Sequence, residues 1–274
     1  MNAADPLVVE MAAKCHGQVV FFDRNAANPL LAKRREAGGR VVFVRDNSVV
    51  LADGPSEFSL LSLERIPLTH GGKVGFQVEN VLASAAACWA LGTPAEVIRL
   101  GLETFASTVG KSPGRFNLFR INGATVVVDY GHNTSSLTAL LDVLAQFPHT
   151  VRKAVYSAAG DRRDEDLVRQ GHLLADSFDH VIVYEDHYLR GRKPGEIMDL
   201  FCQGLEMGKR AKETQKIVGW QKACADALAQ ARPGDLLLVQ ADVVDETVDY
   251  LKSLVTSGCS EVQQITLAEA LTSS

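Results

Sequence analysis

The chain has 274 residues, of which 46% are hydrophobic and 22% are charged, and its formal net charge is −5. This length suits one large domain or two of ordinary size, and the composition is that of an ordinary globular protein. The negative charge argues against a nucleic-acid-binding protein, which normally carries a basic stripe. No apolar run is long enough to cross a bilayer and no signal peptide is visible, so we expect a cytoplasmic protein without a membrane partner.

The cysteines do not form a metal-binding or disulfide pattern. There are five, an odd number, and none belongs to a C-x-x-C pair: Cys15, Cys88, Cys202, Cys224 and Cys259. Disulfide frameworks and zinc sites use paired, regularly spaced cysteines. We therefore expect reduced thiols and assign no metal ligand to this chain.

A β-rich segment opens the chain. Residues 19–22 form a short apolar run, and residues 58–66 are a further strand candidate that Pro67 ends. Residues 40–45 and 48–52 are β-branched runs on either side of Asp46-Asn47, which is typical of a β-hairpin.

Two helices and a linker follow. Residues 80–91 are rich in alanine and stop before Gly92, a residue that readily ends a helix. Residues 94–105 begin with proline and repeat apolar residues at helical spacing. The stretch 110–114 is typical of a linker, and we place a domain boundary after residue 112.

An alternating pattern of strands and helices begins at residue 117. Residues 118–121 and 125–129 flank Asn122-Gly123, a strong hairpin signal. The strands expected after this hairpin are 154–157, 180–184, 216–218 and 235–239. The expected helices are 135–147, 165–178, 195–207, 220–231 and 245–255. Apolar strands separated by helices predict that residues 113–256 form an α/β domain with a Rossmann-like, mostly parallel sheet covered on both faces. Residues 257–274 lack a firm pattern and are expected to form a loosely docked tail.

Polar clusters follow four of the expected strands, at residues 129–133, 157–164, 185–192 and 240–242. Ligands of doubly wound sheets bind at the carboxyl ends of the strands, where these clusters are expected to meet. Local explanations exist for each residue. Asp129 could cap the next turn, His132 and His187 could be exposed, and Arg190 and Arg192 could form a solvated basic loop. Their convergence on one edge favours a functional site.

Familiar nucleotide-binding motifs are absent. Gly110-Lys111-Ser112 resembles the end of a phosphate loop, but Phe105 stands where that loop requires glycine, and a helix rather than a strand precedes it. No G-x-G-x-x-G, G-x-S-x-G or H-E-x-x-H occurs.

Several of these segments resemble a known family. Residues 113–117 and 127–133 are similar to the start of the C-terminal domain of Mur-type ligases. Residues 156–164 and 184–192 closely resemble the cyanophycin synthetases within that group. Residues 2–6 and 70–80 resemble the latter part of a Mur-ligase central domain, so residues 1–112 are expected to be part of such a domain. The resemblance covers nearly all of residues 1–256.

This resemblance implies an ATP-dependent amide ligase. Such a ligase activates the β-carboxylate of a cyanophycin or poly-aspartate primer as an acyl phosphate and joins it to the α-amine of arginine, with ATP and Mg²⁺ as cofactors. The implied ATP-binding residues are His70 and Asn80 near the adenine, Arg115 near the ribose or α-phosphate, and Asp129 at the ribose hydroxyls. The implied catalytic residues are His132, Asn133, Asp161 and Arg162. The implied amino-acid-binding residues are Asp186, His187, Arg190 and Arg192.

The chain also departs from the family pattern. The family's N-terminal domain, ATP-grasp domain, P-loop and most Mg²⁺ ligands do not occur in these 274 residues. We therefore expect little activity from the chain alone, and self-association or pairing with a complementing N-terminal ligase portion. The alternatives are a non-catalytic module that binds a nucleotide or cyanophycin, and an unrelated α/β binding protein.

Overall fold

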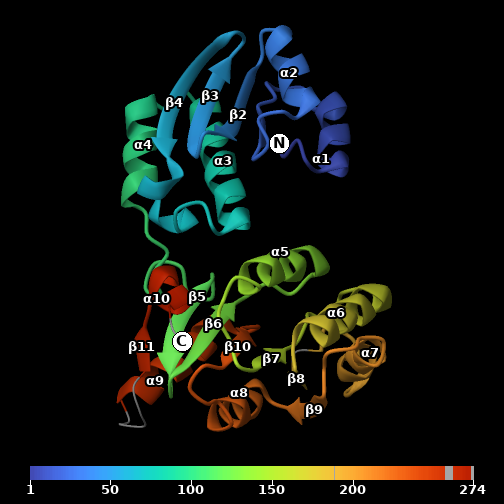
Figure 1. Cartoon of the computed structure of the whole chain (residues 1–274). Coiled ribbons are helices and arrows are strands. Elements are labelled where there is room, and N and C mark those ends of the chain that lie inside the picture. The colour runs from blue at the N-terminus through green and yellow to red at the C-terminus, as the bar shows by residue number, and fades with distance from the viewer. Residues whose placement is uncertain (188, 257–261, 273–274) are drawn as a thin grey trace. The chain divides into compact units, whose positions relative to one another are not determined.

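The computed structural model describes residues 1–187, 189–256 and 262–272 (Figure 1). The chain divides between Ala106 and Ser107 into two compact units, which we call unit 1 (Met1–Ala106) and unit 2 (Ser107–Ser274). Each has its own sheet and core. Among the described helices, none is both long and apolar enough to span a membrane.

Unit 1 is built on a four-stranded sheet in the order β1-β2-β3-β4. β1 runs parallel to β2, and the other neighbours are antiparallel. The strands are β1 (Phe21–Asp23), β2 (Arg40–Arg45), β3 (Ser48–Asp53) and β4 (Ser56–Ser62). The helices are α1 (Pro6–Met11), α2 (Pro29–Glu36), α3 (Gly75–Ala90) and α4 (Ala95–Thr104). Apolar residues of α3 and α4 pack on one face of the sheet, and those of α1 and α2 pack on the other (Figure 1).

Local signals explain most of unit 1. The predicted hairpin is confirmed, with Asp46 and Asn47 at φ of 47° and 56°. The prediction of a strand through residue 66 is wrong after Ser62, whose hydroxyl accepts a hydrogen bond from the Glu64 N–H and starts two short 3₁₀ turns, Leu63–Arg65 and Pro67–Thr69. Helix α3 begins before the predicted residue 80, because its start carries no capping side chain that the sequence would reveal.

Unit 2 contains a seven-stranded sheet in the order β11-β5-β6-β10-β7-β8-β9. Its strands are β5 (Asn117–Ile121), β6 (Ala124–Asp129), β7 (Arg152–Tyr156), β8 (His180–Glu185), β9 (Glu213–Val218), β10 (Leu236–Gln240) and β11 (Val262–Gln264). The five strands from β6 to β9 in this order are parallel to their neighbours, whereas β5 forms an antiparallel hairpin with β6. The predicted mostly parallel α/β fold is therefore confirmed.

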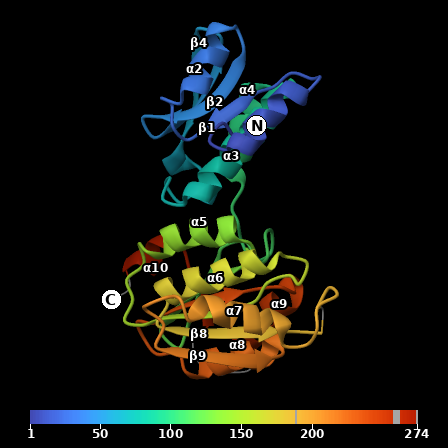
Figure 2. The same cartoon turned by 90° about the vertical axis from the view of Figure 1, so that its right-hand side faces the viewer.

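Helices cover both faces of this sheet. They are α5 (Thr134–Leu144), α6 (Asp164–Ser177), α7 (Glu196–Leu205), α8 (Trp220–Ala229), α9 (Val244–Thr256) and α10 (Leu267–Thr272). Helices α5, α6 and α7 lie side by side on one face (Figure 2). Trp220 of α8 and Leu251 of α9 pack with Val239 on the other face. The hairpin between β5 and β6 turns at Asn122 and Gly123, with φ of 53° and 76°, as the Asn-Gly pair predicts.

The described part of the C-terminal segment is docked on unit 2. β11 pairs antiparallel with β5, and Leu267 and Ala270 of α10 are buried. This differs from the loosely docked tail expected from the sequence. A three-residue strand and a six-residue helix are too short to show a periodic pattern, and their positions depend on the open edge that β5 presents.

The docked segment predicts a stability effect. Leu267→Ala should lower the free energy of unfolding of unit 2 by about 2–4 kcal/mol, because it empties a buried leucine site. Gln264→Ala, at an exposed position on β11, is the control and should change it by less than about 0.5 kcal/mol. Denaturant unfolding measures both, and an unchanged stability in Leu267→Ala would show that the segment is not docked.

Candidate functional site

The carboxyl ends of β6, β10, β7 and β8 lie at one edge of the sheet, because these strands are adjacent and parallel. The loops that leave these ends carry the polar clusters found in the sequence. We call residues 129–133, 157–163, 185–187, 189–192 and 240–242 the carboxyl edge. Asp129, Asp161 and Asp186 thus come from different strand ends to the same side of unit 2.

Asp129, the last residue of β6, anchors the strand end to neighbouring loops. Its Oδ2 accepts a hydrogen bond from the Phe116 N–H at 2.9 Å, and its Oδ1 accepts one from the Gly131 N–H at 2.6 Å. Burial raises the pKa of the Asp129 carboxyl, against the opposing effect of these two bonds and of the Arg115 charge. The Arg115 guanidinium lies over the Tyr130 ring, 4.8 Å from its centroid. Arg115 and Asp129 thus lie near one another, as a shared ligand site requires.

His132 is held in one tautomer. Its Nδ1 lies 3.2 Å from the Tyr130 carbonyl oxygen, and its Nε2 lies 2.7 Å from Nη2 of Arg162. A carbonyl can only accept and a guanidinium can only donate, so Nδ1 carries the proton and Nε2 accepts. Burial and the charges of Arg162 and Arg190 hold the pKa of His132 below its usual value, against the opposing effects of the Tyr130 hydrogen bond and of Asp242.

Asn133 caps helix α5. Its side chain accepts a hydrogen bond from the Ser136 N–H at 2.9 Å, while the Ser136 hydroxyl accepts one from the Asn133 N–H. The sequence suggested a place at the acyl phosphate for Asn133, and the structure shows that its oxygen is engaged in capping. Beside it, the Thr134 hydroxyl and the Arg162 Nε are buried without a hydrogen-bond partner among the described residues. These two donors are available to an anionic ligand.

Arg192 braces the loop that carries Asp161 and Arg162. Its Nε donates to the Gly160 carbonyl at 2.7 Å, its Nη2 donates to the Arg162 carbonyl and to Asp164, and its Nη1 donates to Glu196. The side chain is only 13% exposed. These internal bonds occupy the donors that a substrate carboxylate would need.

Arg190 differs from its neighbour Arg192 in its exposure. Its Nη1 donates to Asp161 Oδ2 at 3.1 Å, and both side chains face solvent. The hydrogen bond from Arg190 is the main cause that lowers the pKa of Asp161. This pair is accessible to a ligand that carries both a positive and a negative group.

Asp186 joins the β8 loop to the start of helix α8. Its Oδ2 accepts a hydrogen bond from the Trp220 N–H at 3.3 Å, and its Oδ1 accepts one from the His187 N–H at 2.8 Å. The His187 Nδ1 also lies 2.6 Å from Oδ1, while the rest of the ring is exposed. Burial raises the pKa of Asp186, but the hydrogen bonds from His187 and Trp220 outweigh it, so the pKa lies below its usual value.

Two buried tyrosines beneath the carboxyl edge were not singled out by the sequence analysis. The Tyr156 hydroxyl lies 2.9 Å from the Gly131 carbonyl oxygen, and the Tyr184 hydroxyl donates to the Gln240 carbonyl at 2.9 Å. In the sequence both stand inside apolar strands, so only their position at strand ends could have singled them out. Glu185, which opens one of the predicted polar clusters, is also buried, and its Oε1 accepts a hydrogen bond from the Gly195 N–H.

Two predicted ATP contacts belong to unit 1. Asn80, on α3, donates from Nδ2 to Gln77 Oε1 at 3.0 Å. His70 ends a 3₁₀ turn with φ of 50°, and burial lowers its pKa. Their contact with an adenine remains a prediction. Within the described residues, no group of three or more His, Cys, Asp or Glu side chains is arranged to hold a metal ion.

Comparison with known proteins identifies the family. Residues 114–243 match the model of the Mur ligase, glutamate ligase domain. Most of unit 2 is thus similar to this Mur ligase domain. The chain is also 33% identical over 253 residues to cyanophycin synthetase of Synechocystis sp., and 32% identical over 252 residues to that of Nostoc sp.. Each match covers 92% of this chain but only 29% and 28% of the relatives, so the chain spans less than a third of their length.

Two solved structures share the fold. A bifunctional folylpolyglutamate synthase/dihydrofolate synthase from Yersinia pestis, complexed with AMPPNP and Mn ion, has a TM-score of 0.57 at 19% identity, covering 89% of this chain and 50% of that chain. MurF ligase from Thermotoga maritima, in complex with ADP, has a TM-score of 0.53 at 17% identity, covering 92% and 57%. At these identities the likeness establishes the fold alone.

The geometry of His132 in this Mur ligase domain predicts its titration. The His132 pKa should lie below 6.5, and Arg162→Met should raise it, because removing a nearby positive charge favours the protonated ring. Stability should fall as the pH drops from about 6.5 through the folded-state pKa, because only the unfolded chain then takes up the proton. NMR titration of the imidazole measures the pKa. Arg163→Met, which removes an exposed charge paired with Asp166, is the control, and an equal shift in both variants would contradict the assignment.

The contacts of Arg192 predict that its loss lowers the free energy of unfolding of unit 2. Arg192→Met should destabilise unit 2 by about 2–4 kcal/mol, because two carbonyls and two carboxylates lose their donor. Arg190→Met removes an exposed ion pair and should cost less than about 1 kcal/mol. Chemical denaturation distinguishes them, and equal costs would disprove the bracing role.

Proposed function

We propose that the chain corresponds to the C-terminal portion of an ATP-dependent amide ligase of the cyanophycin synthetase type. Its reaction joins the α-amine of arginine to the β-carboxylate of an aspartate in cyanophycin or a poly-aspartate primer. The observation that carries this proposal is the similarity to cyanophycin synthetases over 92% of the chain, which exceeds the match to the general domain model. Residues 1–112 would then be the latter part of a Mur-ligase central domain.

The proposed chemistry has two steps. The β-carboxylate attacks the γ-phosphorus of ATP, giving an acyl phosphate and ADP. The arginine amine then attacks the acyl carbon, an amide forms, and phosphate and a proton leave. Both steps develop negative charge on phosphoryl or carbonyl oxygens, which fixed cations stabilise.

The described residues suit parts of this chemistry. Arg115 and Asp129 stand together at the end of β6, where they would hold the ribose and α-phosphate. The Nε of Arg162 is buried and has no hydrogen-bond partner among the described residues, and Arg162 lies beside His132. This Nε would donate a hydrogen bond to the acyl phosphate. The exposed pair of Asp161 and Arg190 would face the charged groups of the incoming arginine.

Other predicted site residues are better explained as positioning residues. Arg192, Asp186 and Asn133 use their polar atoms to hold loops and helix starts. Arg192 would therefore act through the loop of Asp161 and Arg162, and Asp186 through His187. Asn133 would act through the adjacent His132. His187 remains exposed next to Asp186 and could contact substrate directly.

The β- and γ-phosphates and Mg²⁺ need further groups. Phosphate loops supply backbone N–H groups and place the metal, and no such motif occurs in these 274 residues. The described side chains likewise do not form a metal site. On this proposal these groups come from a complementing N-terminal ligase portion.

Reconstitution tests the proposal. The 274-residue chain alone should show no arginine-dependent ATP hydrolysis with a poly-aspartate primer, because it lacks a phosphate loop. Mixing it with the separately produced N-terminal portion of a related cyanophycin synthetase should restore arginine incorporation. In the mixture Arg162→Met should lower the rate by about 100-fold, the scale for losing one charge-stabilising donor.

The control is Arg169→Met, which removes an exposed cation from α6. It should leave the rate unchanged. Turnover by the chain alone would contradict the proposal that a complementing N-terminal portion supplies part of the site. A mixture that binds ATP or the primer but incorporates neither arginine nor lysine would favour a non-catalytic module.

A further inference from the structure

A cluster of cations lies at the opposite, amino-terminal edge of the unit 2 sheet. Arg152 is the first residue of β7, Asp179 directly precedes β8, and Arg210 precedes β9. His149 lies just before β7, and its Nε2 is 3.4 Å from Nη2 of Arg210. We call His149, Arg152, Asp179 and Arg210 the amino-edge cluster. The ligase chemistry proposed above does not use it.

Two nitrogens of the buried Arg152 guanidinium lack a hydrogen-bond partner. The residue is 6% exposed, and its Nε and Nη2 make no hydrogen bond within the described residues. Its guanidinium lies over the Phe178 ring, 5.1 Å from the centroid. A ring face attracts a cation but accepts no conventional hydrogen bond, so these donors remain unsatisfied. Buried charges are normally paired, and an exception needs an explanation.

The nearby carboxylate is already engaged. Asp179 accepts two hydrogen bonds from the Arg210 guanidinium, at 3.2 Å on Oδ1 and 2.9 Å on Oδ2. Its Oδ2 also accepts one from the Arg152 backbone N–H at 2.9 Å. One carboxylate therefore faces two guanidinium groups, which leaves an excess positive charge. Burial and then the charge of Arg210 lower the pKa of Arg152, against the opposing effect of the Asp179 charge.

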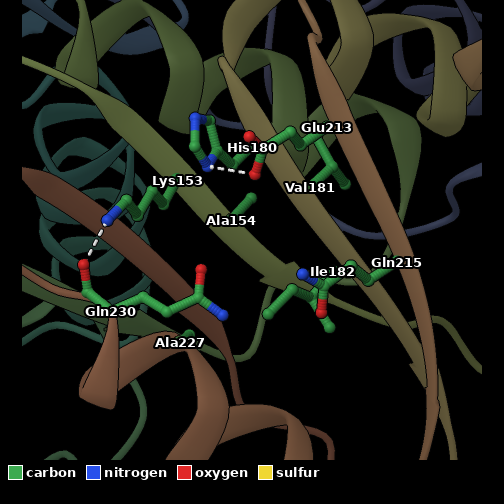
Figure 3. A pocket seen from close by; sticks show the side chains of 9 residues that line it. All are labelled: Lys153, Ala154, His180, Val181, Ile182, Glu213, Gln215, Ala227 and Gln230. Atoms are coloured by element: carbon green, nitrogen blue, oxygen red, sulfur yellow. Dashed lines mark hydrogen bonds and ion pairs between the residues drawn. The ribbon is translucent and has the colours of Figure 1, made fainter.

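The next residue of the same strand shows what a satisfied buried cation looks like. Lys153 points to the other face of the sheet, where its Nζ donates to the Gln230 carbonyl at 2.6 Å (Figure 3). It also pairs with Asp235 at 2.8 Å. The cavity beside Lys153 is only about 10 Å³, so it offers no room for a ligand. Lys153 is thus paired, whereas Nε and Nη2 of Arg152 have no hydrogen-bond partner among the described residues.

We infer that the amino-edge cluster binds a phosphate group, with Arg152 and Arg210 as its main ligands and His149 beside them. Nε and Nη2 of Arg152 are unpartnered among the described residues, and Arg210, whose Nε and Nη2 bond to Asp179 and His149, adds its Nη1. Several N–H donors from two guanidinium groups suit a tetrahedral oxyanion. The excess positive charge matches a ligand that carries at least one negative charge. The phosphate could be free or part of a nucleotide, and both share this chemistry.

NMR of the arginine Nε–H groups in the full 274-residue chain tests this inference. Inorganic phosphate, ATP and acetate are titrated separately at constant ionic strength, and the Arg152 and Arg210 side-chain signals are assigned through correlations to their own backbone amides. Phosphate or ATP should shift the Arg152 signal with saturation. In Arg152→Met the phosphate affinity, read from the Arg210 signal, should fall at least about tenfold, the equivalent of one charged hydrogen bond. The control Arg169→Met should retain the wild-type affinity.

The outcomes separate the possibilities. Saturation by phosphate but not ATP indicates a free-phosphate site, and saturation by ATP as well indicates a nucleotide phosphate. An Arg152 signal that does not move, or that moves equally with acetate, overturns the inference. If Arg152→Met does not fold, Arg210→Met provides the same comparison with the Arg152 signal as readout. Neither result depends on ligase activity, so the proposed function can fail while this site stands.

Discussion

The hydrogen bond between Arg162 and His132 joins the two loops on which the candidate site depends. One loop leaves β6 and the other leaves β7, and β10 lies between these strands in the sheet. The bond requires a neutral imidazole that accepts at Nε2, and both burial and the guanidinium charge favour that form. A protonated His132 would repel Arg162. The arrangement of the carboxyl edge thus depends on the neutral form of the His132 imidazole.

Many polar residues at this edge serve to build it. Four side chains form hydrogen bonds with backbone groups of neighbouring segments: Asp129, Asn133, Asp186 and Arg192. Loops at strand ends have no ladder to satisfy their backbone, so side chains take over that role. What remains for a ligand is a smaller set: Arg115 over Tyr130, the free donors of Arg162 and Thr134, and the exposed pair of Asp161 and Arg190. On the proposed function, only this smaller set would contact a substrate, although the whole motif resembles the family.

Local signals in the sequence were sufficient for much of the fold. The Asp46-Asn47 and Asn122-Gly123 pairs fix their hairpins through positive φ, and apolar strands between amphipathic helices specify a parallel sheet. The segment around Leu267 could not be predicted, because its position depends on the distant edge of β5. The same holds for the site. The sequence placed the clusters on one edge, but the partners of Arg192 lie up to 32 residues away, and no local rule identifies them.

Ligand binding at the carboxyl edge of unit 2 is tested most directly by amide NMR of the chain during a titration with millimolar ADP. Signals of Gly131, His132 and Arg162 should move together and saturate. Saturating shifts confined to other parts of unit 2, with these three amides unchanged, would contradict it.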